Sequence, residues 1–172
     1  QKGRDHKSPL EFYKDYSGIL VTDSLQQYHL IEKKLPNVTN ANCWAHARRS
    51  FADAVKIADK KDPKSVKQSV AYQALQKIGG FYTADTELKM LSSQERLQKR
   101  QEFIKPLVEE FFAWVKEQAA RCVVPPKSKT GQGLQYLIHQ EPYLKVFLTD
   151  GDVPIDNSAS ERAIRTFCEY SD

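Results

Sequence analysis

Two acidic residues stand where they could take part in chemistry. Asp23 directly follows residues 18–22 (GILVT), a short apolar and β-branched run that predicts a buried strand. Open α/β sheets bind their ligands at the carboxyl ends of parallel strands, so Asp23 is a candidate ligand-binding group. Glu161 lies within residues 156–165 (DNSASERAIR), where Asn157, Glu161 and Arg165 share one face of a predicted helix.

Each carboxylate also has a purely structural interpretation. Asp23 could cap the helix that follows it, a role that Asp fills well. Ser158 and Glu161 have the spacing of a capping box, and Glu161 could pair with Arg165 one turn later. Position alone therefore leaves both interpretations open.

A third cluster occupies residues 43–49 (CWAHARR). Cys43 and His46 have an interval typical of metal ligands, but no second pair follows at zinc spacing, so we do not predict a zinc site. We interpret His46 as a supporting residue that lies near an active site or makes a local hydrogen bond. Arg48 and Arg49 could bind phosphates, or they could lie on a solvated helix face.

A basic loop around Lys127 and Lys129 precedes another predicted helix. Lysines beside a helix N-terminus suit phosphate contact, since the free N–H groups there also favour anions. An ordinary solvated turn would have the same sequence, so these lysines decide nothing by themselves.

The pattern of apolar residues predicts which elements carry these side chains. Strands over residues 18–22 and 38–43, with a helix over 25–35 between them, predict a parallel β-α-β unit. Helical stripes follow over residues 44–58, 66–78 and 92–120, with Pro106 expected to kink or split the last. Short helices are predicted over 134–139 and 142–148, and Asn157 opens a final one.

The composition of the chain excludes few classes of protein. The 172 residues suffice for one domain with a core, 40% are hydrophobic, and the net charge of +4 permits nucleic-acid binding without requiring it. Three widely spaced cysteines argue against a disulfide scaffold, and no apolar run is long enough to span a membrane. We therefore expect a cytoplasmic protein with no membrane partner.

Three stretches together resemble the transposases of the insertion-sequence 66 family. They are residues 18–23 with Tyr28, residues 43–51 (CWAHARRSF) and residues 155–165 (IDNSASERAIR). The resemblance covers about residues 9–167. The second and third stretches are long enough to be specific, and their occurrence together at this separation is specific too.

This resemblance implies a fold and a division of the chain. The expected class is α/β, a partial RNase H-like fold with few strands and a large, mostly helical insertion. Residues 1–47 would form part of the core, 48–150 the insertion, and 151–172 a terminal catalytic helix that returns to the core.

The resemblance also implies a DNA transposase of the DDE type, in which Asp23 is the second acidic residue and Glu161 the third. Such enzymes use two Mg²⁺ (or Mn²⁺) ions, about 3.5–4 Å apart, to cleave and join DNA strands. Hard divalent cations prefer oxygen ligands. Arg48, Arg49, Arg162 and Arg165 would then offset phosphate charge, with Lys127 and Lys129 as further DNA contacts and His46 and Asn157 in support.

Other expectations concern partners and completeness. The implied partners are transposon-end and target DNA, a second copy of the chain and helper proteins of the same element. The family's first Asp has no counterpart in these residues, so we expect residues 1–172 alone to be inactive. An alternative from the residues themselves is a non-catalytic helical module for DNA binding or complex assembly.

Overall fold

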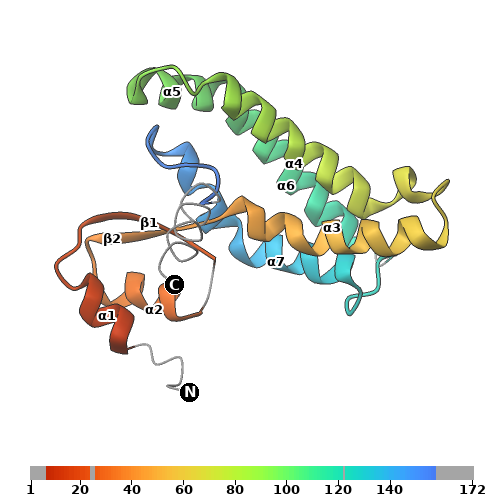
Figure 1. Cartoon of the computed structure of the whole chain (residues 1–172), viewed down its shortest axis with the longest axis horizontal. Helices are drawn as coiled ribbons and strands as arrows, with labels where there is room; N and C mark the ends of the chain where they lie inside the picture. Colours follow the sequence, from red (N-terminus) through yellow and green to blue (C-terminus); the bar gives the residue numbers. More distant parts are fainter. Residues whose placement is uncertain (1–6, 24–25, 122, 158–172) are drawn as a thin grey trace, which may run out of the picture.

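Two parallel strands and two helices form the N-terminal part of the computed structural model, which describes residues 7–23, 26–121 and 123–157. They are α1 (Lys7–Tyr13), β1 (Gly18–Thr22), α2 (Gln26–Lys34) and β2 (Val38–Asn42). The strands pair from Gly18↔Val38 to Thr22↔Asn42, which confirms the predicted parallel unit. Figure 1 shows α1 and α2 on the same side of the two strands.

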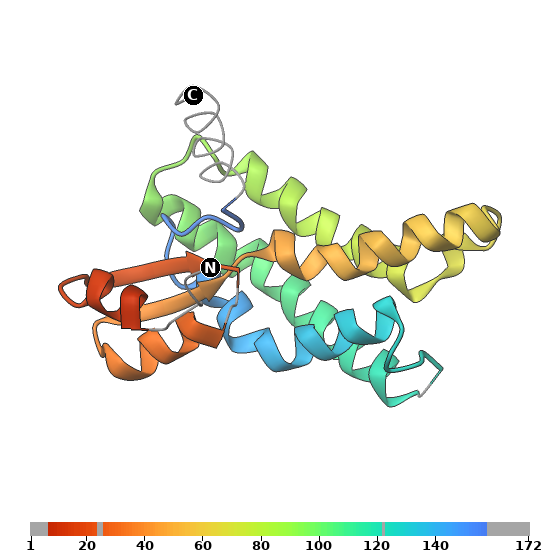
Figure 2. The same ribbon diagram turned by 60° about the horizontal axis from the view of Figure 1, so that its bottom comes forward.

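Helices form most of the chain from Trp44 onward, and none of those described is long and apolar enough to cross a membrane. Figure 2 shows α3, α4, α6 and α7 running alongside one another, with the sheet at one end. This arrangement is consistent with the predicted α/β class, although helix predominates. The helical segments are α3 (Trp44–Lys61), η1 (Val66–Gln68), α4 (Val70–Glu87), α5 (Ser93–Lys99), the π-helical η2 (Arg100–Ile104), α6 (Lys105–Ala120), α7 (Lys129–Leu144) and η3 (Val146–Leu148).

The side chain of Trp44 is the centre of the core. It is completely buried, and its indole Nε1 donates a 2.8 Å hydrogen bond to the carbonyl oxygen of Leu144. Aromatic rings from three other segments surround it, with centroids 5.3–6.4 Å away: Phe81, Phe111, Phe112 and Phe147. The first residue of α3 therefore fixes α4, α6, α7 and η3 relative to the end of β2.

Two predicted helix boundaries are wrong. The second stripe was expected to end near Gly79-Gly80, but α4 continues to Glu87 because Ile78 and Phe81, on either side of the glycines, are both buried in the core. Residues 134–148 were expected to form two helices, but α7 runs unbroken through Pro142 to Leu144. In both places burial of the apolar face outweighs the local cost of Gly or Pro.

The predicted start and interruption of the helix over residues 92–120 are confirmed. Ser92 caps α5 in a capping box with Glu95, which satisfies two backbone N–H groups at once. Pro106 cannot donate a backbone hydrogen bond, and the helix is interrupted just before it by η2, where Lys105 N bonds to Arg100 O in the wider π pattern.

Candidate active site

Three segments that are far apart in the sequence meet at the carboxyl end of the sheet. The amide of Cys43 donates to Thr22 O (2.9 Å), and the amide of Trp44 donates to Ile155 O (3.2 Å). The amide of Asn157 donates to the Cys43 thiol sulfur (3.4 Å). The ends of both strands are thereby joined to the start of the predicted terminal motif.

Asp23 lies at this junction. It follows Thr22 directly and is partly buried, and the parallel register places it level with Cys43. The position agrees with the sequence expectation that Asp23 follows a strand of a parallel sheet. It is the one predicted catalytic residue that the described part of the chain contains, because Glu161 lies outside the described residues.

Cys43 acts at the junction as a structural contact. Its side chain is completely buried, and burial raises the pKa of the thiol despite hydrogen bonds from the amide of Asn157 and neighbouring amides. The group is therefore protonated near neutral pH, which does not suit a thiolate nucleophile or metal ligand. Sequence reasoning considered Cys43 only as a metal ligand and missed its contact with Asn157.

The two predicted supporting residues both contact Cys43. The amide of His46 donates to Cys43 O (3.1 Å), and Asn157 bonds to the thiol as described above. His46 Nδ1 and Asn157 Oδ1 are buried, and neither atom has a hydrogen-bond partner among the described residues. The structure thus brings His46 and Asn157 to the same junction as Asp23.

A buried polar network fixes the strand ends against α7. The Thr22 hydroxyl donates to Asn40 Oδ1 (2.9 Å), Asn40 Nδ2 to Asn42 Oδ1 (3.3 Å), and Asn42 Nδ2 to Gln140 Oε1 (2.8 Å). Buried amides that bond to one another in this way specify a single arrangement. These residues were not predicted from the sequence, although Asn is uncommon inside strands and two occur in β2.

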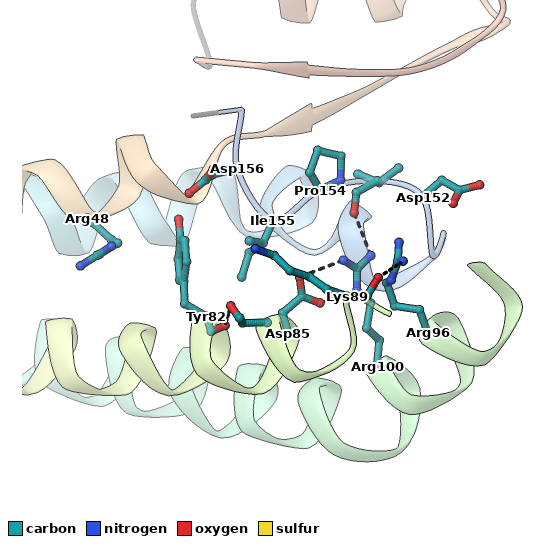
Figure 3. Close-up of a pocket in the computed structure, with 12 residues that line it drawn as sticks. Arg48, Tyr82, Asp85, Lys89, Arg96, Arg100, Asp152, Pro154, Ile155 and Asp156 are labelled. Atoms are coloured by element: carbon teal, nitrogen blue, oxygen red, sulfur yellow. Dashed lines mark hydrogen bonds and ion pairs between the residues drawn. The ribbon is translucent and has the colours of Figure 1, made fainter. Parts of the chain in front are cut away.

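A pocket of about 540 Å³ lies next to the junction, between α4 and residues 152–156 (Figure 3). The guanidinium carbon of Arg48 lies over the Tyr82 ring, 5.1 Å from its centroid. Figure 3 shows the Tyr82 hydroxyl pointing toward Asp156. Burial, together with this carboxyl group, raises the pKa of Tyr82, so the phenol is neutral at physiological pH. The remaining lining residues are Asp85, Thr86, Lys89, Arg96, Arg100 and Asp152–Ile155.

Comparison with known proteins identifies the family of this chain. The Transposase IS66 family model matches residues 1–169. The chain belongs to the IS66 transposase family. No solved structure matches it.

This IS66-family chain is also similar to curated proteins of Sinorhizobium fredii. The uncharacterized protein y4hP is 31% identical over 171 residues, which is 95% of this chain and 30% of y4hP. The uncharacterized protein y4qI is 31% identical over 157 residues, 87% of this chain and 27% of y4qI. The chain therefore spans less than a third of the length of either relative.

The predicted DNA-contacting residues of the IS66-family chain are spread out. Arg48 is partly buried beside the pocket, whereas Arg49 is exposed one residue later on α3. Lys127 and Lys129 are exposed at the start of α7, but it is Gln140, eleven residues after Lys129, that contacts the sheet. The rise of an α-helix puts these lysines roughly 17 Å further along the axis. Arg162 and Arg165 lie outside the described residues.

Proposed function

We propose that these residues are part of the catalytic domain of a DNA transposase, in which Asp23 and Glu161 are two of three metal-binding carboxylates. The observation that supports this most strongly is the junction of Thr22, Cys43 and Asn157 at the end of the sheet. Glu161 follows Asn157 by four residues, one turn of the predicted helix, so the contact at Asn157 favours a Glu161 carboxylate near Asp23.

The proposal includes the division of the chain made from the sequence. Residues 1–47 and 151–172 would belong to an RNase H-like core, and residues 48–150 would be the helical insertion. In support, residues 155 and 157 contact Trp44 and Cys43 directly, although more than a hundred residues separate them in the sequence. The intervening helices therefore leave and return at nearly the same place.

The chemistry of the donor set fits Mg²⁺ or Mn²⁺. Asp23 supplies a hard carboxylate oxygen, the ligand type that these ions prefer. The described residues contain no group of three or more His, Cys, Asp or Glu side chains that could hold a metal ion. In the proposed site the other donors are Glu161 and a third carboxylate, as in the DDE triad that the family resemblance implies. Bound divalent ions would supply activation of the attacking oxygen and stabilisation of the leaving oxygen. Asp23 and Glu161 would hold and orient them.

A strand-transfer assay with the full-length transposase tests this function. Supplied with DNA that carries the element ends and with Mg²⁺, the enzyme is expected to cut at the ends and join them to target DNA, and a chelator is expected to stop both steps. Binding of the ends without cleavage or joining under any divalent ion would instead support the non-catalytic binding or assembly module.

DNA binding by α3 gives a separate prediction. Arg49→Ala removes an exposed cation near the strand ends, so it is expected to weaken DNA binding and to lower the slope of log K against log salt by about 0.9 for each phosphate that is no longer neutralised. Arg48→Ala is expected to do the same, with some loss of packing against Tyr82. Affinity is measured by fluorescence anisotropy across a salt series.

Arg121→Ala is the matched control, because Arg121 is also exposed but pairs with Glu117 at the end of α6. Its salt slope should equal that of the wild type. A wild-type slope for both Arg48→Ala and Arg49→Ala would show that these arginines only solvate a helix face.

A further inference from the structure

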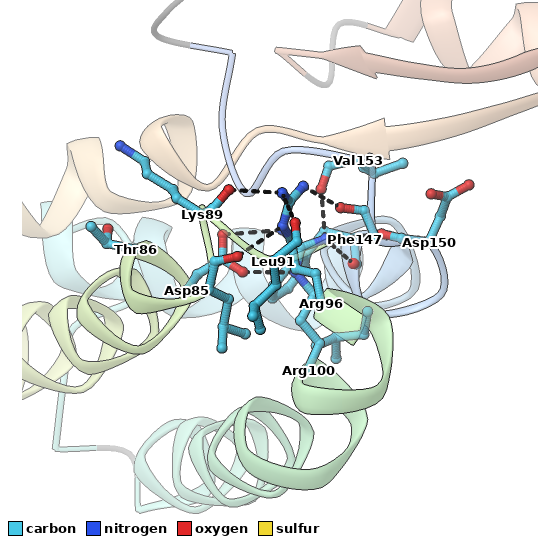
Figure 4. Close-up of polar contacts among 12 residues, drawn as sticks. Asp85, Thr86, Lys89, Leu91, Arg96, Arg100, Phe147, Asp150 and Val153 are labelled. Atoms are coloured by element: carbon cyan, nitrogen blue, oxygen red, sulfur yellow. Dashed lines mark hydrogen bonds and ion pairs between the residues drawn. The ribbon is translucent and has the colours of Figure 1, made fainter. Parts of the chain in front are cut away.

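Arg100 is a buried arginine. Its hydrogen bonds go to the carboxylate of Asp85 and to backbone carbonyl groups in the loop of residues 147–153, which follows α7. Its side chain is 2% exposed. Nε and Nη2 donate to the two carboxylate oxygens of Asp85 on α4 (2.7 and 3.0 Å). Nη1 donates to the carbonyl oxygens of Phe147, Asp150 and Val153 (2.9, 2.9 and 2.8 Å). Figure 4 shows the guanidinium at the point where α4, η2 and this loop meet.

Arg96 adds a second set of contacts one helical turn earlier. Its Nη1 donates to Gly151 O (2.9 Å), while Nε and Nη2 donate to carbonyl oxygens at and after the end of α4, those of Leu88, Lys89 and Leu91. Gly151 lies so close to α5 that an added Cβ would be 1.9 Å from the carbonyl oxygen of Ser93. The loop backbone is therefore pressed directly onto the start of α5.

The loop needs such donors because most of it has no regular structure. Residues 149–157 follow η3 without forming a further helix or strand among the described residues, so buried carbonyl groups there must find partners elsewhere. A guanidinium has five N–H donors in a rigid fork, which suits several carbonyl groups that point at one place. Gln101 adds a hydrogen bond to Leu148 O (2.6 Å).

The same loop leads into the candidate active site. Two residues after Val153, Ile155 O accepts the hydrogen bond from the amide of Trp44, and Asn157 reaches Cys43. Residues 147–157 are thus fixed at both ends, by the arginines on the insertion side and by the strand ends on the core side.

We propose that Arg96 and Arg100 are positioning residues, which hold residues 147–153 so that residues 155–157 meet the ends of the strands at Asp23 and Cys43. This inference rests on the proposed function. The helical insertion then has a specific role, because α4, α5 and η2 hold the segment that leads into the terminal motif. Neither arginine is assigned a contact with DNA or metal.

The test uses Arg96→Ala in the full-length transposase, because Arg96 is less buried than Arg100 and its loss is less disruptive to folding. At saturating DNA the rate of strand joining is expected to fall by about 10–100-fold, since small displacements of a catalytic group cost that much. The dissociation constant for the DNA ends should stay within about twofold, and the Mg²⁺ concentration at half-maximal rate should rise. Arg96→Lys keeps the charge but lacks the fork, so it should remain impaired.

Arg121→Ala again serves as the control and should leave the rate and the Mg²⁺ midpoint unchanged. Hydrogen–deuterium exchange provides an activity-independent readout: Arg96→Ala should speed exchange of amides in residues 147–157. Wild-type exchange in that segment, or a wild-type rate and Mg²⁺ midpoint, would overturn the inference. Failure of the wild-type enzyme to join any ends would overturn the proposed function instead, and exchange would still decide whether the arginines hold the loop.

Discussion

Asp23→Asn in the full-length transposase is expected to lower the rate of strand cleavage and joining on the order of 10³-fold or more, with DNA binding within about threefold of wild type. Asparagine has nearly the same shape as aspartate, so the β1–β2 junction should be kept. The negative charge that would hold a divalent ion is lost. Single-turnover assays with pre-bound DNA ends separate this loss of chemistry from any change in binding.

Asp15→Asn is the matched control, because Asp15 is an exposed residue just before β1 and receives the same substitution. It should behave as wild type, and Glu161→Gln should behave as Asp23→Asn. Near wild-type joining by Asp23→Asn would return Asp23 to its structural interpretation, a cap for the following helix.

Trp44→Ala is expected to lower the free energy of unfolding by about 3–5 kcal/mol, the usual cost of removing a fully buried large aromatic side chain. The substitution leaves a cavity among Phe81, Phe111 and Phe112 and removes the hydrogen bond to Leu144 O. Because Trp44 adjoins Cys43, the junction at the strand ends should loosen as well. Denaturant unfolding, followed by far-UV circular dichroism, measures the change.

Trp114→Ala is the matched control for this core position. Trp114 is on α6 and stacks on Phe111, but it is only partly buried, so its loss should cost less, about 1–2 kcal/mol. An equal decrease in the free energy of unfolding for Trp44→Ala and Trp114→Ala would contradict the conclusion that Trp44 is the centre of the core.

The features predicted correctly from the sequence are those that local signals determine. The apolar, β-branched residues before Asp23 predicted β1, and the apolar stripe over residues 92–120 predicted a helix that begins near Ser92. Pro106 predicted the interruption before α6, because a proline inside a helix lacks the backbone N–H donor and its ring clashes with the preceding turn. The stripe headed by Trp44 and Phe51 predicted which face of α3 is buried.

The features missed from the sequence depend on contacts between distant segments. Gly79, Gly80 and Pro142 are helix-breaking signals, but packing of α4 and α7 against the core outweighs them. Arg100 lies four residues before the buried Ile104, in register with the apolar stripe. A charge in that register is a signal of a buried ion pair, yet its partner Asp85 and its carbonyl acceptors cannot be read from spacing. The role of Cys43 as hydrogen-bond acceptor for Asn157 could not be predicted either, because the two residues are far apart in the sequence.

The features of the candidate site also differ in how far the sequence predicts them. That Asp23 follows a parallel strand was predictable from the β-α-β pattern. The contacts that join residues 22, 43 and 157 were not, because they link segments that are far apart in the sequence. Resemblance to the family is the basis for the role proposed for Glu161, which no local pattern distinguishes from a capping-box residue.

A crystal structure of the full-length transposase grown with Mn²⁺, with anomalous scattering recorded for the metal, tests the pairing of Asp23 with Glu161 most directly. We predict an anomalous peak within about 2.0–2.6 Å of a carboxylate oxygen from each residue, the range of oxygen–cation contacts in proteins. Well-ordered density in which the two carboxylates point in unrelated directions and share no ion would contradict it.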